Sequence, residues 1–158
     1  MTDLAILKRT TFIVADAEAS AAFYRAVFGW TVWYDNVLRA DRRFPPSGAA
    51  HDAEVRLVIL QADDPKIGKL GLLQYLEPPF DTGTLQRRTA VRMGEPILVI
   101  ETEDVDGVYE RARAAGATVV SEPVNWEVPA PGGDSTIRLR TVSLFDPNGI
   151  YMEVSAHP

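Results

Sequence analysis

The sequence predicts an α+β protein of two βαβββ modules that form one curved, mostly antiparallel mixed sheet around a cup. The main observation is an internal repeat: Asp104 follows Asp16 by 88 positions, and Gly116 follows Gly29 by 87. The chain has 158 residues, of which 46% are hydrophobic, enough for one compact domain. A half of this size cannot bury its helix and its apolar sheet face well alone, so we expect two halves side by side.

The first module follows from alternation, capping and turn signals in the first half of the chain. Asp16 is a good helix N-cap and Gly29 a good residue to end that helix. Alternating or β-branched runs predict the strands around it. The predicted strands of this module cover residues 10–14, 30–34, 55–61 and 69–77.

The second module repeats this order. Asp104 caps a helix that ends at Gly116, and residues 146–149, Asp-Pro-Asn-Gly, form a turn between the last two strands. The predicted strands cover residues 97–102, 117–121, 136–145 and 150–155. We therefore expect a single domain over 1–158, with modules at 1–79 and 95–158. Residues 80–94 connect them, and Phe80 and Leu85 are expected to pack under this connection.

Composition excludes several classes of function. The chain has 16 basic and 22 acidic residues, and after Ala90 the counts are 5 and 11, so we expect no nucleic-acid or anionic membrane partner. The absence of cysteine excludes disulfides, zinc-thiolate sites and cysteine nucleophiles. No apolar run is long enough to span a membrane, and the N-terminus does not resemble a signal peptide. We expect a cytoplasmic protein.

Two stretches carry a resemblance to a known family. The first covers residues 12–30 and includes Phe-Ile-Val-Ala-Asp, Phe-Tyr-Arg and Phe-Gly-Trp; the second is Phe-Asp-Pro-Asn-Gly-Ile-Tyr-Met-Glu-Val at 145–154. Together they resemble the vicinal oxygen chelate superfamily, which includes glyoxalase I, extradiol ring-cleaving dioxygenases and bleomycin-type, antibiotic-sequestering resistance proteins. The resemblance implies a glyoxalase/dioxygenase-like fold, a small-molecule ligand inside the cup and a homodimer.

The resemblance also implies where a metal would be bound, on the first and last strands of each module. In this sequence those positions are Arg9, Gln74, Ile97 and Glu153, of which only Glu153 matches a family ligand. A catalytic divalent ion needs about three imidazole or carboxylate ligands, and an arginine stays protonated in proteins. We therefore expect no metal or other cofactor.

The same positions suggest another site. Arg9 and Glu153 are expected to face each other, either as a buried ion pair or as a pair that acts on a ligand. In the second case Arg9 holds a carboxylate, enolate or carbonyl oxygen, and Glu153 orients the ligand or accepts a proton. Gln74 and Ile97 would contact the ligand. Trp126 lies in a Pro/Gly-rich segment that predicts a loop, and it is interpreted as a lid or a dimer contact.

The leading hypothesis is a metal-independent protein that binds a small organic molecule, with or without catalysis. One alternative is a metal-dependent enzyme, a glyoxalase-like lyase or ring-cleaving dioxygenase, with ligands at other positions such as His51. The other is an antibiotic-sequestering resistance protein, which binds a drug without changing it. Uptake of a metal would favour the first alternative, and binding without turnover the second.

Overall fold

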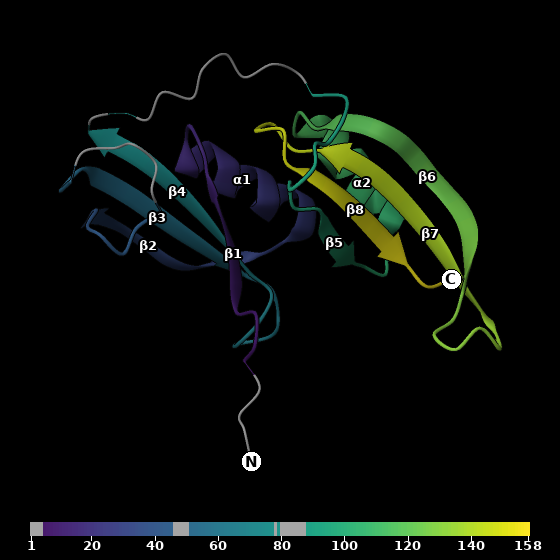
Figure 1. Cartoon of the computed structure of the whole chain (residues 1–158). Coiled ribbons are helices and arrows are strands. Elements are labelled where there is room, and N and C mark those ends of the chain that lie inside the picture. The colour runs from purple at the N-terminus through teal and green to yellow at the C-terminus, as the bar shows by residue number, and fades with distance from the viewer. Residues whose placement is uncertain (1–4, 46–50, 78, 80–87) are drawn as a thin grey trace. The chain divides into compact units, whose positions relative to one another are not determined.

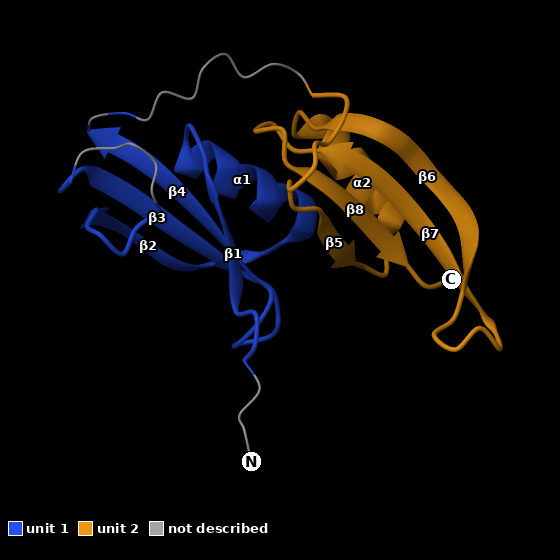
Figure 2. Cartoon of the chain, viewed as in Figure 1, with its two compact units in different colours: residues 1–84 blue, residues 85–158 orange. Residues whose placement is uncertain are grey.

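The computed structural model describes residues 5–45, 51–77, 79 and 88–158 (Figure 1). The chain divides into two compact units, residues 1–84 and 85–158 (Figure 2). Each unit has the strand–helix–strand–strand–strand order and contains one four-stranded mixed sheet. The predicted α+β class with two βαβββ modules is therefore confirmed, with one four-stranded sheet in each unit where the sequence predicted a single continuous sheet. The division falls within the predicted connection, where residues 80–87, including Phe80 and Leu85, lie outside the described residues.

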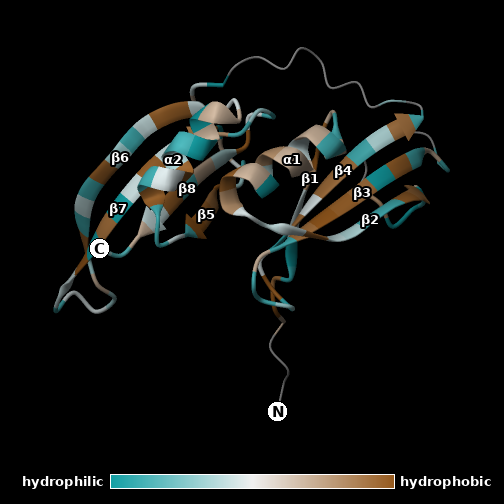
Figure 3. Cartoon of the chain, turned by 180° about the vertical axis from the view of Figure 1, so that it is seen from behind, coloured by the Kyte–Doolittle hydropathy of each residue, from teal (hydrophilic) through white to brown (hydrophobic). Residues whose placement is uncertain are grey.

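The first unit contains one helix and four strands. They are β1 (Arg9–Ile13), α1 (Ala17–Phe28), β2 (Thr31–Arg39), β3 (Glu54–Gln61) and β4 (Lys69–Glu77). The sheet has the order β1-β4-β3-β2, in which β1 runs parallel to β4 and the other pairs are antiparallel. Strands β3 and β4 are mostly hydrophobic (Figure 3). Their side chains Val58, Leu60 and Leu72 are fully buried and form the core with Tyr24 and Val27 of α1.

The ends of α1 confirm the capping prediction. Asp16 has an extended backbone, and its side chain accepts a hydrogen bond of 2.9 Å from the backbone N–H of Ala19. Gly29 ends the helix with φ of 72°, a left-handed conformation that favours glycine. The local sequence therefore sets where α1 begins and ends, and so fixes its place on the sheet.

The second unit repeats this architecture. Its elements are β5 (Leu98–Glu101), α2 (Val105–Ala114), β6 (Thr118–Pro129), β7 (Thr136–Phe145) and β8 (Tyr151–Ala156), with the sheet order β5-β8-β7-β6. Asp104 caps α2 by accepting from Gly107 at 2.8 Å. In the turn before β8, Asp146 accepts from the backbone of Asn148 and Ile150, both at 2.8 Å, and Gly149 has φ of 81°.

Two strands are longer than predicted. Strand β2 continues to Arg39 instead of ending at residue 34, and β6 continues to Pro129 instead of 121. In both cases pairing with a long neighbour extends the strand: Arg39 pairs with Glu54, and Pro129 with Thr136. Both strands lie at sheet edges, where the missing N–H of a proline is tolerated. Trp126 therefore lies in a strand, which corrects the loop prediction.

The face of the first sheet opposite α1, called the open face below, has two different ends. At one end, Ala40 and Ala53 from the β2–β3 connection cover Val55, Leu73 and Tyr75 in a hydrophobic cluster. The other end, at the start of β1 and β4, lies outside this cluster. None of the described helices is long and apolar enough to cross a membrane.

Candidate functional site

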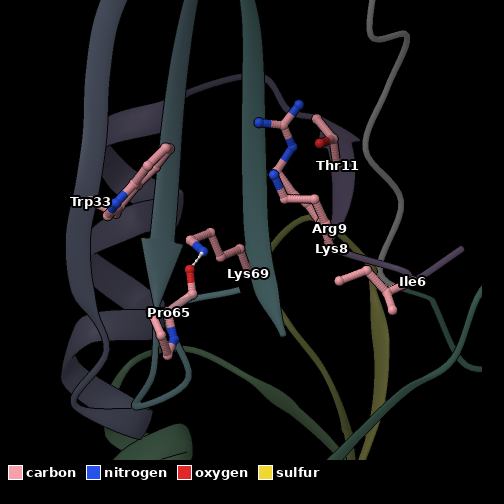
Figure 4. Close-up of a pocket in the computed structure, with 7 residues that line it drawn as sticks. All are labelled: Ile6, Lys8, Arg9, Thr11, Trp33, Pro65 and Lys69. Carbon is pink, nitrogen blue, oxygen red and sulfur yellow. Dashed lines mark hydrogen bonds between the residues drawn. The ribbon is translucent and has the colours of Figure 1, made fainter. Parts of the chain in front are cut away.

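The end of the open face at the start of β1 and β4 forms a pocket of about 600 Å³ within the first unit (Figure 4). Three of the lining side chains are cationic, one is an indole, one is a hydroxyl and two are aliphatic. They are Ile6, Lys8, Arg9, Thr11, Trp33, Pro65 and Lys69. A pocket of this size is typical of small-molecule sites.

Sheet register brings these residues together. Strands β1 and β4 are parallel neighbours in which Arg9 pairs with Lys69, so two cations from distant parts of the sequence lie side by side. Thr11 follows Arg9 by two positions and therefore shares its face. Trp33 lies at a register shift of β2, between the paired residues Val32 and Tyr34.

A glycine makes room for the side chain of Thr11, one of the pocket residues. Thr11 pairs with Gly71 on β4, and a Cβ atom placed on Gly71 would lie 2.4 Å from the Thr11 hydroxyl oxygen. The Thr11 side chain therefore lies over the backbone of β4 in space that any other residue would fill. A glycine inside a strand often marks such a close approach.

Lys69 is a buried cation at the edge of this pocket. Only 7% of the residue is exposed. Its ammonium group donates a hydrogen bond to the carbonyl oxygen of Pro65 and lies 5.1 Å from the centre of the Trp33 ring (Figure 4). Both contacts stabilise a positive charge, which would otherwise be costly at a buried position.

The electrostatic balance of the pocket is positive. No acidic residue lines it, and within the described part of the chain Lys8, Arg9 and Lys69 form no ion pair. Asp64 is the acidic neighbour of Lys69. Hydrogen bonds from the backbone of Lys66 and Ile67 lower the pKa of Asp64, and the charge of Lys69 contributes to the same shift. An anionic ligand would supply the charge that the pocket lacks.

The predicted site residues fall in both units. Arg9 lines the pocket, whereas Gln74 points to the helix face, where its side-chain oxygen accepts a hydrogen bond of 2.9 Å from the backbone N–H of Ala17. Gln74 thus satisfies a free N–H at the start of α1. Ile97, which is 46% exposed, precedes β5 rather than beginning it.

Glu153 and Trp126 lie on the second sheet. Glu153 pairs with Val99 on β5 and with Ser143 on β7, and it is half-buried. The Trp126 indole donates a hydrogen bond of 2.7 Å to the Thr141 hydroxyl, which is 2.8 Å from that of Ser155. The expected pairing of Arg9 with Glu153 and the lid role of Trp126 stay predictions.

The sequence interpretation missed Lys8, Thr11, Trp33 and Lys69 as pocket residues. Two signals could have pointed to this region. Lys69 is a charged residue at the start of an apolar strand, and Gly71 interrupts that strand two positions later. Their meaning depends on the parallel register of β1 against β4, which the sequence does not state.

The register also identifies equivalent positions of the two modules. With the offset of 88 positions between the helix caps, Thr11 corresponds to Val99; Thr11 pairs with Gly71, and Val99 pairs with Glu153. Gly71, and not Gln74, is therefore the counterpart of Glu153. The positions that would hold a metal become Arg9, Gly71, Ile97 and Glu153, which offer one carboxylate.

This donor set does not fit a catalytic divalent ion, which needs about three imidazole or carboxylate ligands. Among the residues that the structure describes, no three His, Cys, Asp or Glu side chains gather in a group that could hold a metal. His51 lies in an exposed turn, and His157 follows the last strand.

The structure is that of an α+β protein of two βαβββ modules, with a pocket on a sheet face of the first unit. The chain belongs to the Glyoxalase/Bleomycin resistance protein/Dioxygenase superfamily, whose family model matches residues 6–154. Among solved structures, a glyoxalase family protein from Bacillus cereus has a TM-score of 0.75 at 18% identity, covering 98% of this chain and 95% of that one. A glyoxalase/bleomycin resistance protein/dioxygenase family enzyme from Burkholderia phytofirmans PsJN has a TM-score of 0.56 at 19% identity, covering 98% and 100%. These likenesses show the fold alone.

A curated relative is the 4-hydroxyphenylpyruvate dioxygenase of Neurospora crassa. It is 29% identical over 156 residues, which cover 90% of this chain and 37% of the relative. The chain thus spans about a third of the length of that enzyme.

Proposed function

We propose that this protein binds a small organic anion in the pocket of its first unit, without a resident metal. The observation that carries the proposal is that Lys8, Arg9 and Lys69 line one pocket that no acidic side chain lines. Clustered cations repel one another, and a bound anion removes that repulsion.

The side chains of the pocket suit a carboxylate or an enolate. The planar guanidinium of Arg9 can donate two parallel hydrogen bonds to a carboxylate, which gives both affinity and orientation. Thr11 adds a hydroxyl that can donate to a ligand oxygen. The two lysines add charge. In this scheme Arg9 holds the anionic group directly, which is the role expected from the sequence if Arg9 acts on a ligand and not only in a buried ion pair.

The curated relative suggests which acids to test first. Its name refers to 4-hydroxyphenylpyruvate, an aromatic 2-oxo acid, which combines a carboxylate with a neighbouring carbonyl oxygen. The Arg9 and Lys8 side chains would bind these two groups in the same way as other carboxylates and carbonyls. A dioxygenase activity is a second candidate, because the name of this relative is that of a dioxygenase, and a sequestering role is a third.

The test is calorimetric titration with 4-hydroxyphenylpyruvate and pyruvate, followed by analysis of the recovered ligand. We expect binding by the unmodified protein and at least about a tenfold loss of affinity in Arg9→Met, because a charge-assisted hydrogen bond contributes about 1.5–3 kcal/mol. Arg25→Met, which removes an exposed arginine of α1 outside the pocket, is the matched control and should bind normally.

The outcomes separate the candidates. Unchanged ligand after incubation supports binding without catalysis, whereas consumed ligand and a new product favour the enzyme. Equal affinities of the unmodified protein and Arg9→Met, or no binding of either acid, would contradict the proposed site. The homodimer expected from the resemblance stays a separate prediction.

A further inference from the structure

We infer that the pocket selects acids that carry an aromatic ring, with Trp33 as the surface on which the ring lies. This inference rests on the proposed function, since it names the class of anion that the same pocket takes. It is carried by the exposure of Trp33, by the contact between Trp33 and Lys69 and by the distance between the two ends of the pocket.

Trp33 is an exposed aromatic residue held in place. It is 58% exposed, although a tryptophan is highly buried on average in folded proteins. The Lys69 ammonium lies 5.1 Å from its ring centre and is itself fixed by Pro65. An indole that is exposed, oriented and part of a pocket wall offers apolar area at little cost in side-chain entropy.

The two ends of the pocket differ in chemistry. Arg9 and Thr11 come from β1, and Trp33 comes from β2, at the opposite edge of the sheet. Strands β4 and β3 lie between them, so β1 and β2 are three strand spacings apart, about 14 Å between backbones. The side chains of Arg9 and Trp33 extend from these two strands over the sheet, so they lie closer together than the two backbones do (Figure 4). A ligand that contacts both ends needs a ring joined to its acid group by a short chain.

Lys69 lines the pocket between these two ends and adds a positive charge there. One N–H of the ammonium group donates to Pro65, and a lysine has three such donors. Lys69 can therefore donate a hydrogen bond to the ligand while it keeps its contact with Trp33. Ile6 and Pro65 add apolar walls. An aromatic acid can contact the indole, the apolar walls and the cations, whereas a short aliphatic acid can contact only the cationic end.

The experiment compares two acids that differ by one phenyl group, 3-phenylpropionate and propionate. Binding is measured by NMR titration of the complete chain, including the indole N–H signal of Trp33, assigned with the variant Trp33→Leu. Burial of a ring contributes about 1.5–3 kcal/mol, so we expect the aromatic acid to bind at least about tenfold more tightly. Only the aromatic acid should shift the Trp33 indole signal strongly.

In Trp33→Leu, the dissociation constants of the two acids should differ by about threefold at most. The dissociation constant of propionate should stay unchanged. The matched control is Trp30→Leu, which removes a tryptophan of the same unit that stacks on Tyr24 and Phe28 outside the pocket and should leave the ratio intact. Because Trp33 is exposed, Trp33→Leu is expected to fold, and the Trp33 signal of the unmodified protein gives an independent readout.

The outcomes distinguish this inference from the proposed function. Equal dissociation constants for the two acids, both dependent on Arg9, would overturn the selection of aromatic acids and leave anion binding intact. Binding of neither acid in the unmodified protein would count against both. A ratio that falls in Trp30→Leu but not in Trp33→Leu would assign the ring to another surface and overturn the inference.

Discussion

Arg56 joins three elements of the first unit through two carboxylates. Its guanidinium donates to Asp35 of β2 at 2.7 and 2.8 Å and to Glu18 of α1 at 2.7 Å. The second unit repeats the arrangement: Arg140 of β7 donates to Asp106 of α2 and to Asn125 of β6. In each module, therefore, one arginine of a central strand fastens the start of the helix to the outer strand.

Replacement of Arg56 by methionine is expected to lower the free energy of unfolding by about 1 kcal/mol at pH 7, a value typical of partly exposed pairs. The hydrogen bond from Arg56 is the main cause of the lowered pKa of Asp35. A carboxyl whose folded pKa is lowered stabilises the fold above its unfolded pKa of about 3.9, and this contribution is lost as the pH falls through the folded value.

Denaturant unfolding at pH 7 and at several values below 4 measures this effect. The difference between the unmodified protein and Arg56→Met should shrink as the pH falls, whereas Arg25→Met should show little difference at any pH. A difference that stays constant to the lowest pH would mean that Arg56 acts through the packing of its stem and not through Asp35.

Gln74 is expected to contribute to stability and not to ligand binding. Gln74→Leu removes the acceptor of the Ala17 N–H and should cost about 1 kcal/mol, because that N–H is left without a partner. Gln61→Leu is the matched control. The buried Oε1 of Gln61 has no partner among the described residues, so its removal should have little effect on stability. A loss of ligand affinity in Gln74→Leu, measured by calorimetry, would contradict this prediction and show that Gln74 contributes to ligand binding.

At the level of elements, local signals predicted most of the fold. The caps Asp16 and Asp104, the glycine after α1 and the Asp-Pro-Asn-Gly turn each act within a few residues, so sequence alone could place them. The ends of β2 and β6 depend on partner strands far away in the sequence. The Pro/Gly-rich composition around Trp126 predicted a loop, because the pairing with β7 that keeps this segment extended cannot be seen in the local sequence.

The same limit applies to the candidate site. Arg9 was found because its position relative to a helix cap can be counted along the chain. Lys69 and Trp33 could not be found in this way, because the first meets Arg9 through the parallel register of two strands and the second reaches the pocket at a register shift. The counterpart of Glu153 was misplaced by three residues for the same reason.

The β1–β4 pair offers a test of how the Thr11 side chain is accommodated. Gly71→Ala would force its new methyl group against the Thr11 side chain, and overpacking of this kind costs about 1–3 kcal/mol. It should also weaken ligand binding, since the methyl group displaces the Thr11 side chain, which lines the pocket. Thr11→Ala in the same chain removes the two closest Thr11 atoms and so relieves the clash.

The two single variants and the double variant Thr11→Ala/Gly71→Ala form a double-mutant cycle, measured by denaturant unfolding. We expect the double variant to be more stable than Gly71→Ala alone, with a coupling of about 1 kcal/mol or more. Additive effects of the two substitutions would show that the side chain of Thr11 does not depend on the absence of a Cβ at residue 71.

In the molecule as a whole, the two units share one architecture but have different residues at equivalent positions of their sheets. The first unit has Arg9, Thr11 and Gly71 at positions where the second has Ile97, Val99 and Glu153. Residues 1–84 contain 9 basic and 11 acidic side chains, so the positive pocket lies in a unit with a net negative charge. Attraction of anions is therefore local to the pocket, which favours a small ligand over a polyanion.

This difference between the units leads to a prediction about metals. With one carboxylate among the four positions implied by the family resemblance, metal removal should not alter the protein. We expect dialysis against EDTA to leave both the melting temperature and the affinity for 4-hydroxyphenylpyruvate unchanged, because in the proposed function a cationic pocket, and not an ion, holds the ligand. Elemental analysis before and after dialysis, with calorimetry, makes the measurement. One equivalent of Ni, Zn, Mn or Fe, whose removal lowers the melting temperature by several degrees, would contradict it, since an ion that binds the folded state stabilises it.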